Sequence, residues 1–177
     1  MKTRQLTWIL AIVVMGVLVA CGGGDEASSA APADAAAAPA EAPAPAGQPV
    51  DNALMSMTVP ADWDIVDDSE KMKMVTLTKK GSGGAVGVYL KVEGGGNWGG
   101  TPEEAVASFA ESKGGSAAAT TTINGIDWVY TTYEAYGTVQ TMMVTKKEGN
   151  KITATVLGDG YDASPDVQMV LDSLVLK

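Results

Sequence analysis

The chain has 177 residues and a formal net charge of −9, with one cysteine and no histidine. A single cysteine excludes an internal disulfide and a cysteine-rich zinc site, and the lack of histidine excludes an imidazole general base and an ordinary histidine metal centre. The acidic balance argues against nucleic acid as a partner, because proteins hold nucleic acid through clustered lysine and arginine.

The first twenty residues have the pattern of a secretory signal peptide. Lys2 and Arg4 precede an apolar run over residues 6–20, which as a helix would span only about 22 Å of a hydrocarbon core about 30 Å thick. The run ends in Leu18-Val19-Ala20-Cys21, which resembles the lipobox of bacterial lipoproteins. The resemblance implies cleavage before Cys21, acylation of that cysteine and stable anchoring at a membrane, because two or more acyl chains hold a protein there.

The residue after the cysteine bears on the location in the cell envelope. In enteric-type bacteria an aspartate at this position signals retention at the inner membrane, and this chain has Gly22 instead. The resemblance therefore favours the outer membrane, with the protein facing the periplasm, if the organism has one. The alternative is a general secretory peptide that carries a cysteine near its end by chance.

Residues 21–50 are expected to form the lipidated cysteine and a disordered tether. Over residues 22–50, twelve of 29 residues are alanine and five of the chain's eight prolines occur, with no bulky apolar side chain before Val50. Such a segment buries too little apolar surface to offset the entropy of ordering, and its prolines interrupt any helix. Residues 51–177 are long enough for one domain with its own core.

The domain is predicted to be α+β, with its elements in the order βββ-α-ββββ-α. Alternation of apolar and polar residues indicates strands at 55–59, 71–80 and 86–92, with a turn at 60–63. Thr101, Pro102 and Glu104 have the spacing of a capping box at the start of a helix that ends at Gly114.

Four more strands and a second helix follow that first helix. The strands are expected at 118–123, 126–133, 138–147 and 151–157, and Asn124-Gly125 is typical of a two-residue hairpin turn. Ser164 and Pro165 open the second helix. Because the turns are short, the strands should form one largely antiparallel sheet of about six to seven strands, covered by the two helices.

Several segments of the domain together carry a second resemblance. They are residues 59–63 (Val-Pro-Ala-Asp-Trp), the helix start at 101–104, the Asn124-Gly125 hairpin that leads into Trp128 and Tyr130, and the C-terminal residues 171–176. In this the domain resembles the PsbP-like fold, a group that includes photosystem II extrinsic proteins, the nuclear-transport factor Mog and many bacterial lipoproteins. A PsbP/Mog-like domain has no shared catalytic residues, and the resemblance implies an accessory or protein-binding role.

Two groups of aromatic residues are candidates for a partner or ligand surface. The glycine-rich loop 94–100 carries Asn97 and Trp98, and Trp98 could either face a partner or fold back as a lid on the core. Trp128 and Tyr130 share one face of a strand, with Tyr136 beyond its end. An exposed aromatic pair indicates binding, but aromatic residues in sheets more often belong to the core, and the core interpretation is favoured.

The acidic residues offer candidate metal ligands. Asp159 and Asp162 lie in one glycine-containing loop, and five more acids lie within residues 62–70, but neither group has the order of a calcium loop, so solvated acidic loops are favoured. No spacing singles out a catalytic group, so the chain is predicted to be a non-enzyme without a cofactor.

The sequence therefore predicts a membrane-anchored extracytoplasmic lipoprotein with a non-catalytic accessory or protein-binding domain. Its expected partners are the membrane, held through the N-terminal lipid, and another protein of the envelope. The alternative is a domain that binds a small molecule, a lipid or a cation in a pocket between sheet and helix.

Overall fold

The structure is a computed structural model, and it describes residues 47–177. The predicted signal peptide, the lipidation site at Cys21 and the tether up to residue 46 lie outside the described residues. Within residues 47–177, neither helix combines the length and the apolar character needed to cross a membrane.

The described chain forms ten strands and two helices. In chain order these are β1 (Gly47–Asp51), β2 (Met55–Pro60), β3 (Trp63–Asp68), β4 (Met74–Lys79), β5 (Gly87–Glu93), α1 (Pro102–Lys113), β6 (Ala119–Ile123), β7 (Ile126–Ala135), β8 (Thr138–Lys147), β9 (Asn150–Leu157), α2 (Pro165–Asp172) and β10 (Val175–Leu176).

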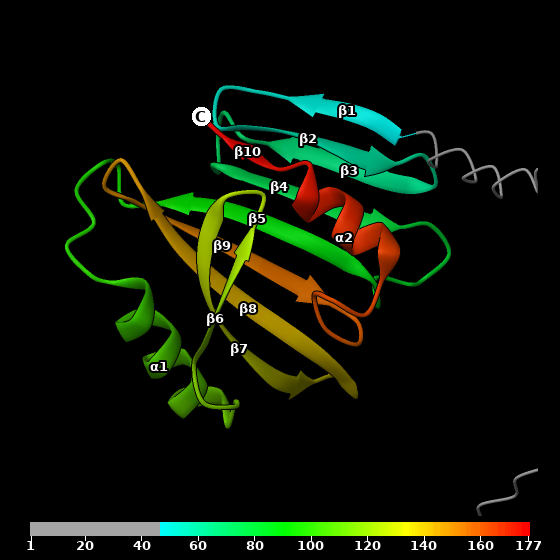
Figure 1. Cartoon of the computed structure of the whole chain (residues 1–177). Coiled ribbons are helices and arrows are strands. Elements are labelled where there is room, and N and C mark those ends of the chain that lie inside the picture. The colour runs from blue at the N-terminus through cyan, green and yellow to red at the C-terminus, as the bar shows by residue number, and fades with distance from the viewer. Residues whose placement is uncertain (1–46) are drawn as a thin grey trace, which may run out of the picture. The chain divides into compact units, whose positions relative to one another are not determined.

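The strands form two antiparallel sheets (Figure 1). The large sheet has seven strands in the order β3-β4-β5-β9-β8-β7-β6, and the small one has three in the order β1-β2-β10. Every pair of neighbouring strands is antiparallel. The predicted α+β class, with a largely antiparallel sheet of about six to seven strands and two covering helices, is confirmed, although the strand predicted at 55–59 lies in the small sheet.

The two helices cover opposite faces of the large sheet. Adjacent residues of a strand point to opposite faces, and on β8 Met143 belongs to the core that includes α2, whereas Met142 and Val144 pack with Val106 of α1. The face toward Met143 is also covered by the small sheet, so this face carries a second layer (Figure 1).

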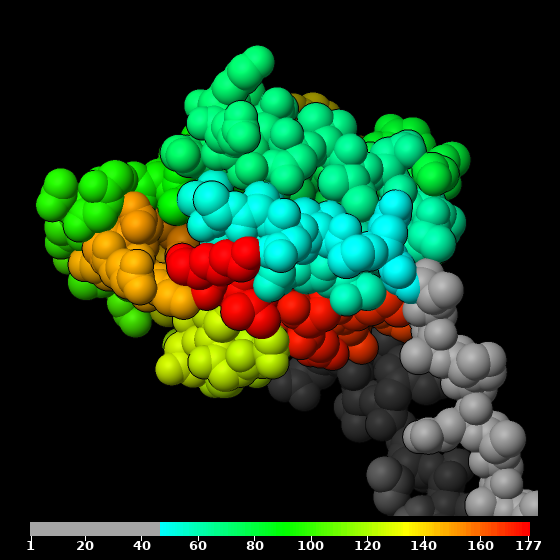
Figure 2. Space-filling view, turned by 90° about the horizontal axis from the view of Figure 1, so that it is seen from above, coloured from blue at the N-terminus to red at the C-terminus, as the bar shows by residue number. Residues whose placement is uncertain are grey.

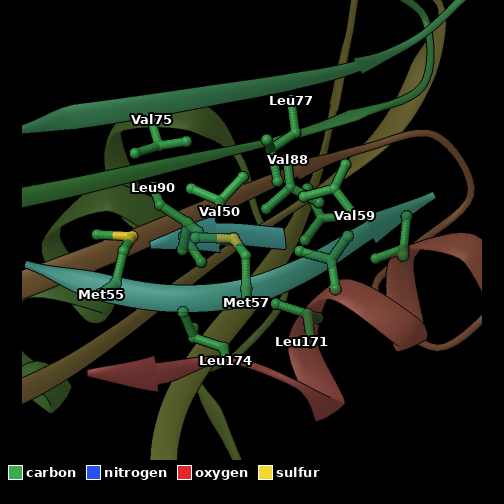
Figure 3. Packing of buried hydrophobic residues seen from close by; sticks show 14 of the residues in the cluster. Val50, Met55, Met57, Val59, Val75, Leu77, Val88, Leu90, Leu171 and Leu174 are labelled. Carbon is green, nitrogen blue, oxygen red and sulfur yellow. The ribbon is translucent and has the colours of Figure 1, made fainter. Parts of the chain in front are cut away.

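The main core lies between the small sheet, α2 and the large sheet. In the close view, Met57 and Val59 of β2 lie between Leu77 and Val88 of the large sheet and Leu171 near the end of α2 (Figure 3). Each of these side chains is at most 4% exposed. Burial of one such side chain contributes roughly 1.5–3 kcal/mol, which makes this layer the main source of stability.

Helix α1 begins and ends as the sequence predicts. The Thr101 hydroxyl accepts a hydrogen bond from the Glu104 N–H at 3.2 Å, and the Glu104 carboxylate accepts one from the Thr101 N–H at 3.1 Å. Gly114 ends the helix in the left-handed conformation at φ 67°. Phe109 packs edge to face on Tyr133 of β7, with ring centroids 5.0 Å apart.

The structure adds three strands that the sequence analysis missed. β1 begins at Gly47, inside the segment assigned to the tether, so the ordered chain starts four residues before the expected position 51. It is an edge strand, where Pro49 is tolerated although it cannot donate a hydrogen bond. β10 has only two residues and is held by pairing with β2.

The third missed strand begins at Trp63, which was expected in a turn. Trp63 is 1% exposed, whereas Asp64 and Val66 face solvent. The carboxylates of this strand hid its alternation, because they are tolerated on an outward face at the edge of a sheet.

The first and last described segments meet on the small sheet. β1 and β10 pair with opposite edges of β2, and the Lys177 ammonium contacts the carboxylate of Asp51. Figure 2 shows the first described residues and the last ones side by side on the surface. The small sheet therefore depends on both ends of the domain.

Two hairpin glycines provide a test of how the loops are held. Gly149 and Gly137 both have positive φ, at 73° and 76°. A Cβ added at Gly149 would overlap the carbonyl of Gly96, whereas a Cβ added at Gly137 would meet no atom of the described chain within 4 Å. We expect Gly137→Ala to cost about 1 kcal/mol of left-handed strain. Gly149→Ala should cost about 1–3 kcal/mol more, because the loop must move. Denaturant unfolding of the two variants measures the difference, and equal losses would contradict it.

Candidate functional site on the open half of the large sheet

One face of the large sheet is only half covered. The cluster under α1 involves β7 and β8, and in the described chain no other helix lies on this face. Cross-strand pairing therefore leaves a row of side chains from four strands on the uncovered half: Val66, Thr76, Tyr89 and Thr155. We call these four residues, with Thr153 and Leu157, the open face.

The open face is neither a core nor an ordinary charged surface. Val66 is 53% exposed, and the other five side chains are half-buried. At its border Glu93 accepts from Lys151 at 2.6 Å and from Lys91 at 2.8 Å, and these hydrogen bonds hold the pKa of Glu93 below its ordinary value. The centre of the surface is thus uncharged in a domain that has a formal charge of −7 over residues 51–177 (ten lysines against seventeen acids).

A hollow of about 660 Å³ lies at one end of the open face. It is bounded by the β4–β5 turn and the β7–β8 turn, with β5, β8 and β9 as its floor. Its lining holds no charged side chain and consists of Gly83, Gly84, Ala85, Tyr89, Tyr136, Thr138, Gln140, Thr155 and Leu157. Its volume is in the range of small-molecule sites, about 300–1,000 Å³.

Tyr136 stands at the rim of this hollow in an unusual conformation. Tyr136 and Gly137 both have positive φ, at 55° and 76°, as the two central residues of a type I′ turn do. The equivalent residues of the other two hairpins are Asn124 and Glu148, and neither is aromatic. The Tyr136 side chain is 100% exposed. A bulky residue is strained in this region, and Tyr136 gains no packing here that would offset the strain.

The wall of the hollow is held in place by hydrogen bonds between β7 and β8. The Tyr133 hydroxyl donates to Oε1 of Gln140 at 2.7 Å, and the Thr138 hydroxyl donates to the Ala135 carbonyl at 3.1 Å. Burial raises the pKa of Tyr133, which keeps the phenol protonated as a donor. Within the described chain the hydroxyls of Tyr89, Tyr136 and Thr155 form no hydrogen bond, so they are available to a ligand.

The structure places Trp98 against the protein. Its side chain packs on the cluster under α1, and the Lys146 ammonium lies 5.4 Å from the ring centroid. The loop that carries it is tied down, because the Trp98 N–H donates to the Gly149 carbonyl at 2.7 Å. This is the arrangement of a lid on the core, whereas Asn97 beside it is exposed.

Trp128 and Tyr130 do not form an exposed aromatic pair. Trp128 is 1% exposed and belongs to the main core, so it cannot contribute to a surface. Tyr130 is half-buried and packs edge to face on Tyr161, with centroids 5.0 Å apart. A hydrogen bond with Tyr161 is the main cause that raises the pKa of Tyr130.

The acidic residues have other roles in the described structure. Within residues 47–177, no three acidic, thiol or imidazole groups converge on a point where a metal ion would fit. Asp159 occupies a turn at φ 39°, and the Asp162 carbonyl accepts from Gln168 at 2.6 Å. Asp67 accepts from the Ser69 N–H at 2.9 Å, and hydrogen bonding to Ser69 lowers its pKa.

A second hollow, of about 710 Å³, lies between the start of α1 and the β6–β8 end of the sheet. Its lining includes Glu103, Asp127 and Lys146. It corresponds in position to the predicted sheet–helix pocket. The first hollow, below Tyr136, lies instead between two turns on the open face, and its lining is uncharged.

The sequence analysis did not identify most of the residues that line the hollow below Tyr136. Tyr89, Gln140 and Thr155 come from three strands that are remote from one another in the sequence and meet only through the sheet order β5-β9-β8. Two signals were present in the sequence. One is a tyrosine followed by glycine in a hairpin turn, and the other is threonine and tyrosine at alternate positions of β5 and β9, which share one face of the sheet. Neither signal shows which half of the sheet α1 leaves uncovered.

Comparison with known proteins agrees with this architecture. A cyanobacterial PsbP (CyanoP) from Synechocystis sp. PCC 6803, solved in solution, superimposes with a TM-score of 0.51 at 12% identity, covering 76% of this chain and 94% of CyanoP. A protein from Bacteroides thetaiotaomicron VPI-5482 gives a TM-score of 0.47 at 18% identity over 70% of this chain, which spans only 45% of that protein. No family model and no curated protein matches the sequence. The domain therefore has a PsbP-like α+β fold.

The raised pKa of Tyr133 predicts a loss of stability at alkaline pH. The unfolded chain ionises first, near the ordinary value of 10.0, while the folded chain still holds the proton, so the free energy of unfolding should fall as pH rises above about 10. Tyr133→Phe should lessen this slope, as measured by denaturant unfolding at several pH values. An unchanged slope, with phenolate absorbance showing that Tyr133 ionises normally, would contradict the burial argument.

Proposed function

We propose that this protein is a lipid-anchored accessory domain of the cell envelope, without catalytic activity, that binds another envelope protein through its open face. The observation that carries the proposal is the uncovered half of the large sheet with the fully exposed Tyr136 at its end. An aromatic residue surrounded by an uncharged surface is typical of the centre of a protein interface. The PsbP-like fold is compatible with an accessory role.

The anchor in this proposal rests on the lipobox resemblance at Leu18-Val19-Ala20-Cys21. The mature chain from Cys21 has a formal charge of −11, because cleavage removes Lys2 and Arg4 (10 basic against 21 acidic residues). An acidic domain is repelled by an anionic lipid surface, so the acyl chains must provide the membrane affinity. The outer membrane, facing the periplasm, is the favoured location.

A second candidate function is the binding of a small ligand in the hollow below Tyr136. Its volume of about 660 Å³ and its three unpaired hydroxyl groups favour this alternative. The two functions are compatible, because the hollow occupies only one end of the open face.

We expect Cys21→Ala to release the protein from the membrane or to trap it as uncleaved precursor, because no acyl chain can then be attached. Fractionation of cell envelopes with an antibody to the domain measures this, and Cys21→Ser provides a second variant of similar size. Normal recovery of both variants in the membrane fraction would refute the anchor.

Photocrosslinking tests the open face directly. We expect a photoreactive amino acid at Tyr136 to capture a discrete envelope protein in native membranes. The same residue at Met72, which is 58% exposed in the β3–β4 turn, is the matched control and should capture little. Equal capture from the two positions, or none from Tyr136, would argue against a protein partner on this surface.

A further inference from the structure

The floor of the hollow below Tyr136, together with the strand beside it, has a specific arrangement of groups. In the sheet register Tyr89 of β5 lies between Thr76 of β4 and Thr155 of β9, and all three point to the open face. An aromatic side chain is thus flanked on both sides by hydroxyl groups. Tyr136 adds a second aromatic side chain at the rim, above the floor.

The lining of this hollow excludes several classes of ligand. None of its nine residues is charged, so a phosphate, a carboxylate or an ammonium group would lose its hydration without a partner. An acyl chain would cover the hydroxyls of Tyr89 and Thr155 and leave them unsatisfied. The ligand must therefore offer apolar contact area and neutral hydrogen-bonding groups at the same time.

A sugar ring has this combination of properties. Its C–H groups form an apolar face that can lie on an aromatic ring, and its hydroxyls project from the rim, where they can both donate and accept hydrogen bonds. Thr76 and Thr155 flank the Tyr89 ring at neighbouring strand positions, about 5 Å to either side. Threonines continue along the open face at Thr153, so a chain of sugars could extend beyond the hollow.

The polar wall of the hollow is fixed before a ligand binds. Gln140 is 7% exposed, and its side-chain oxygen is held by the Tyr133 hydroxyl, so the amide does not have to be ordered on binding. Glycine at 83 and 84 and alanine at 85 keep the opposite wall low. Such preorganisation reduces the entropy that binding must offset.

We propose that the hollow below Tyr136 binds a neutral saccharide, with the sugar ring against Tyr89 and Tyr136 and hydroxyl contacts to Thr155 inside the hollow and to Thr76 on the strand beside it. This deepens the second candidate function, on which it rests, by naming the class of ligand. A neutral glycan of the cell envelope is the chemistry that the site fits.

The test uses the purified full chain and a panel of neutral oligosaccharides built from glucose, mannose and N-acetylglucosamine, with calorimetry and NMR titration. We expect at least one member to bind and to shift the resonances of Tyr89 and Thr155. Thr155→Val, which keeps the shape and removes the hydroxyl, should weaken binding about ten-fold, and so should Tyr136→Ala. Met72→Ala, on another exposed turn, is the control and should leave the affinity unchanged.

Three outcomes would overturn the proposal. The first is no binding by any oligosaccharide at millimolar concentration. The second is binding that survives both Thr155→Val and Tyr136→Ala. The third is occupation of the hollow by an alanine- and proline-rich peptide in preference to every sugar. None of these outcomes tests the protein partner. The crosslinker at Tyr136 captures an envelope protein, or does not, whatever the result of the sugar titration.

Discussion

The fold depends on the difference in how much of each face of the large sheet is covered by other elements. Seven strands spaced about 4.8 Å apart make a sheet about 29 Å wide, whereas a helix is only about 10 Å across and covers about two strands. The face toward Met143 is covered by three strands and a helix, but within residues 47–177 the opposite face has α1 alone. The open face follows from this geometry, and its composition lets it remain in water: four of its six side chains are threonine or tyrosine, whereas the covered positions carry valine, leucine and methionine.

The hairpin turns that join the strands also differ between the covered and the open parts of the sheet. Three of the hairpins use turns with two residues of positive φ, which suit the twist of antiparallel strands. At Asn124 and Glu148 the turn residues are polar, and the Gly149 turn also packs against the loop that holds Trp98. At Tyr136 the same turn serves no contact within the described fold and presents an aromatic side chain to solvent. The local backbone is the same in all three, so the difference lies in the side chain alone.

Much of this fold could be predicted from the sequence, because its signals are local. The capping box at Thr101, the Asn124-Gly125 hairpin and the alternation along β5 each act within a few residues. β1 and β10 escaped prediction because neither has an apolar period of its own; both exist through pairing with β2. The hollow escaped prediction for a related reason: its side chains are brought together by strand order, and strand order is decided by packing across the whole domain. The burial of Trp128, in contrast, could be predicted without the strand order, because aromatic residues in sheets usually belong to the core.

The small sheet also constrains the order in which the protein can reach its final state. β1 and β2 are the first described strands, yet β2 is covered by α2 and extended by β10, which lie more than a hundred residues further along the chain. The Ser173 hydroxyl, which accepts from the Thr58 N–H at 2.8 Å, spans the same separation. Such contacts cannot form until residues 165–176 are available, and long-range pairing of this kind is slow. Until then Met55 and Met57 remain uncovered on a two-stranded ribbon, so the folding chain is exposed to aggregation until its last turn of helix has formed.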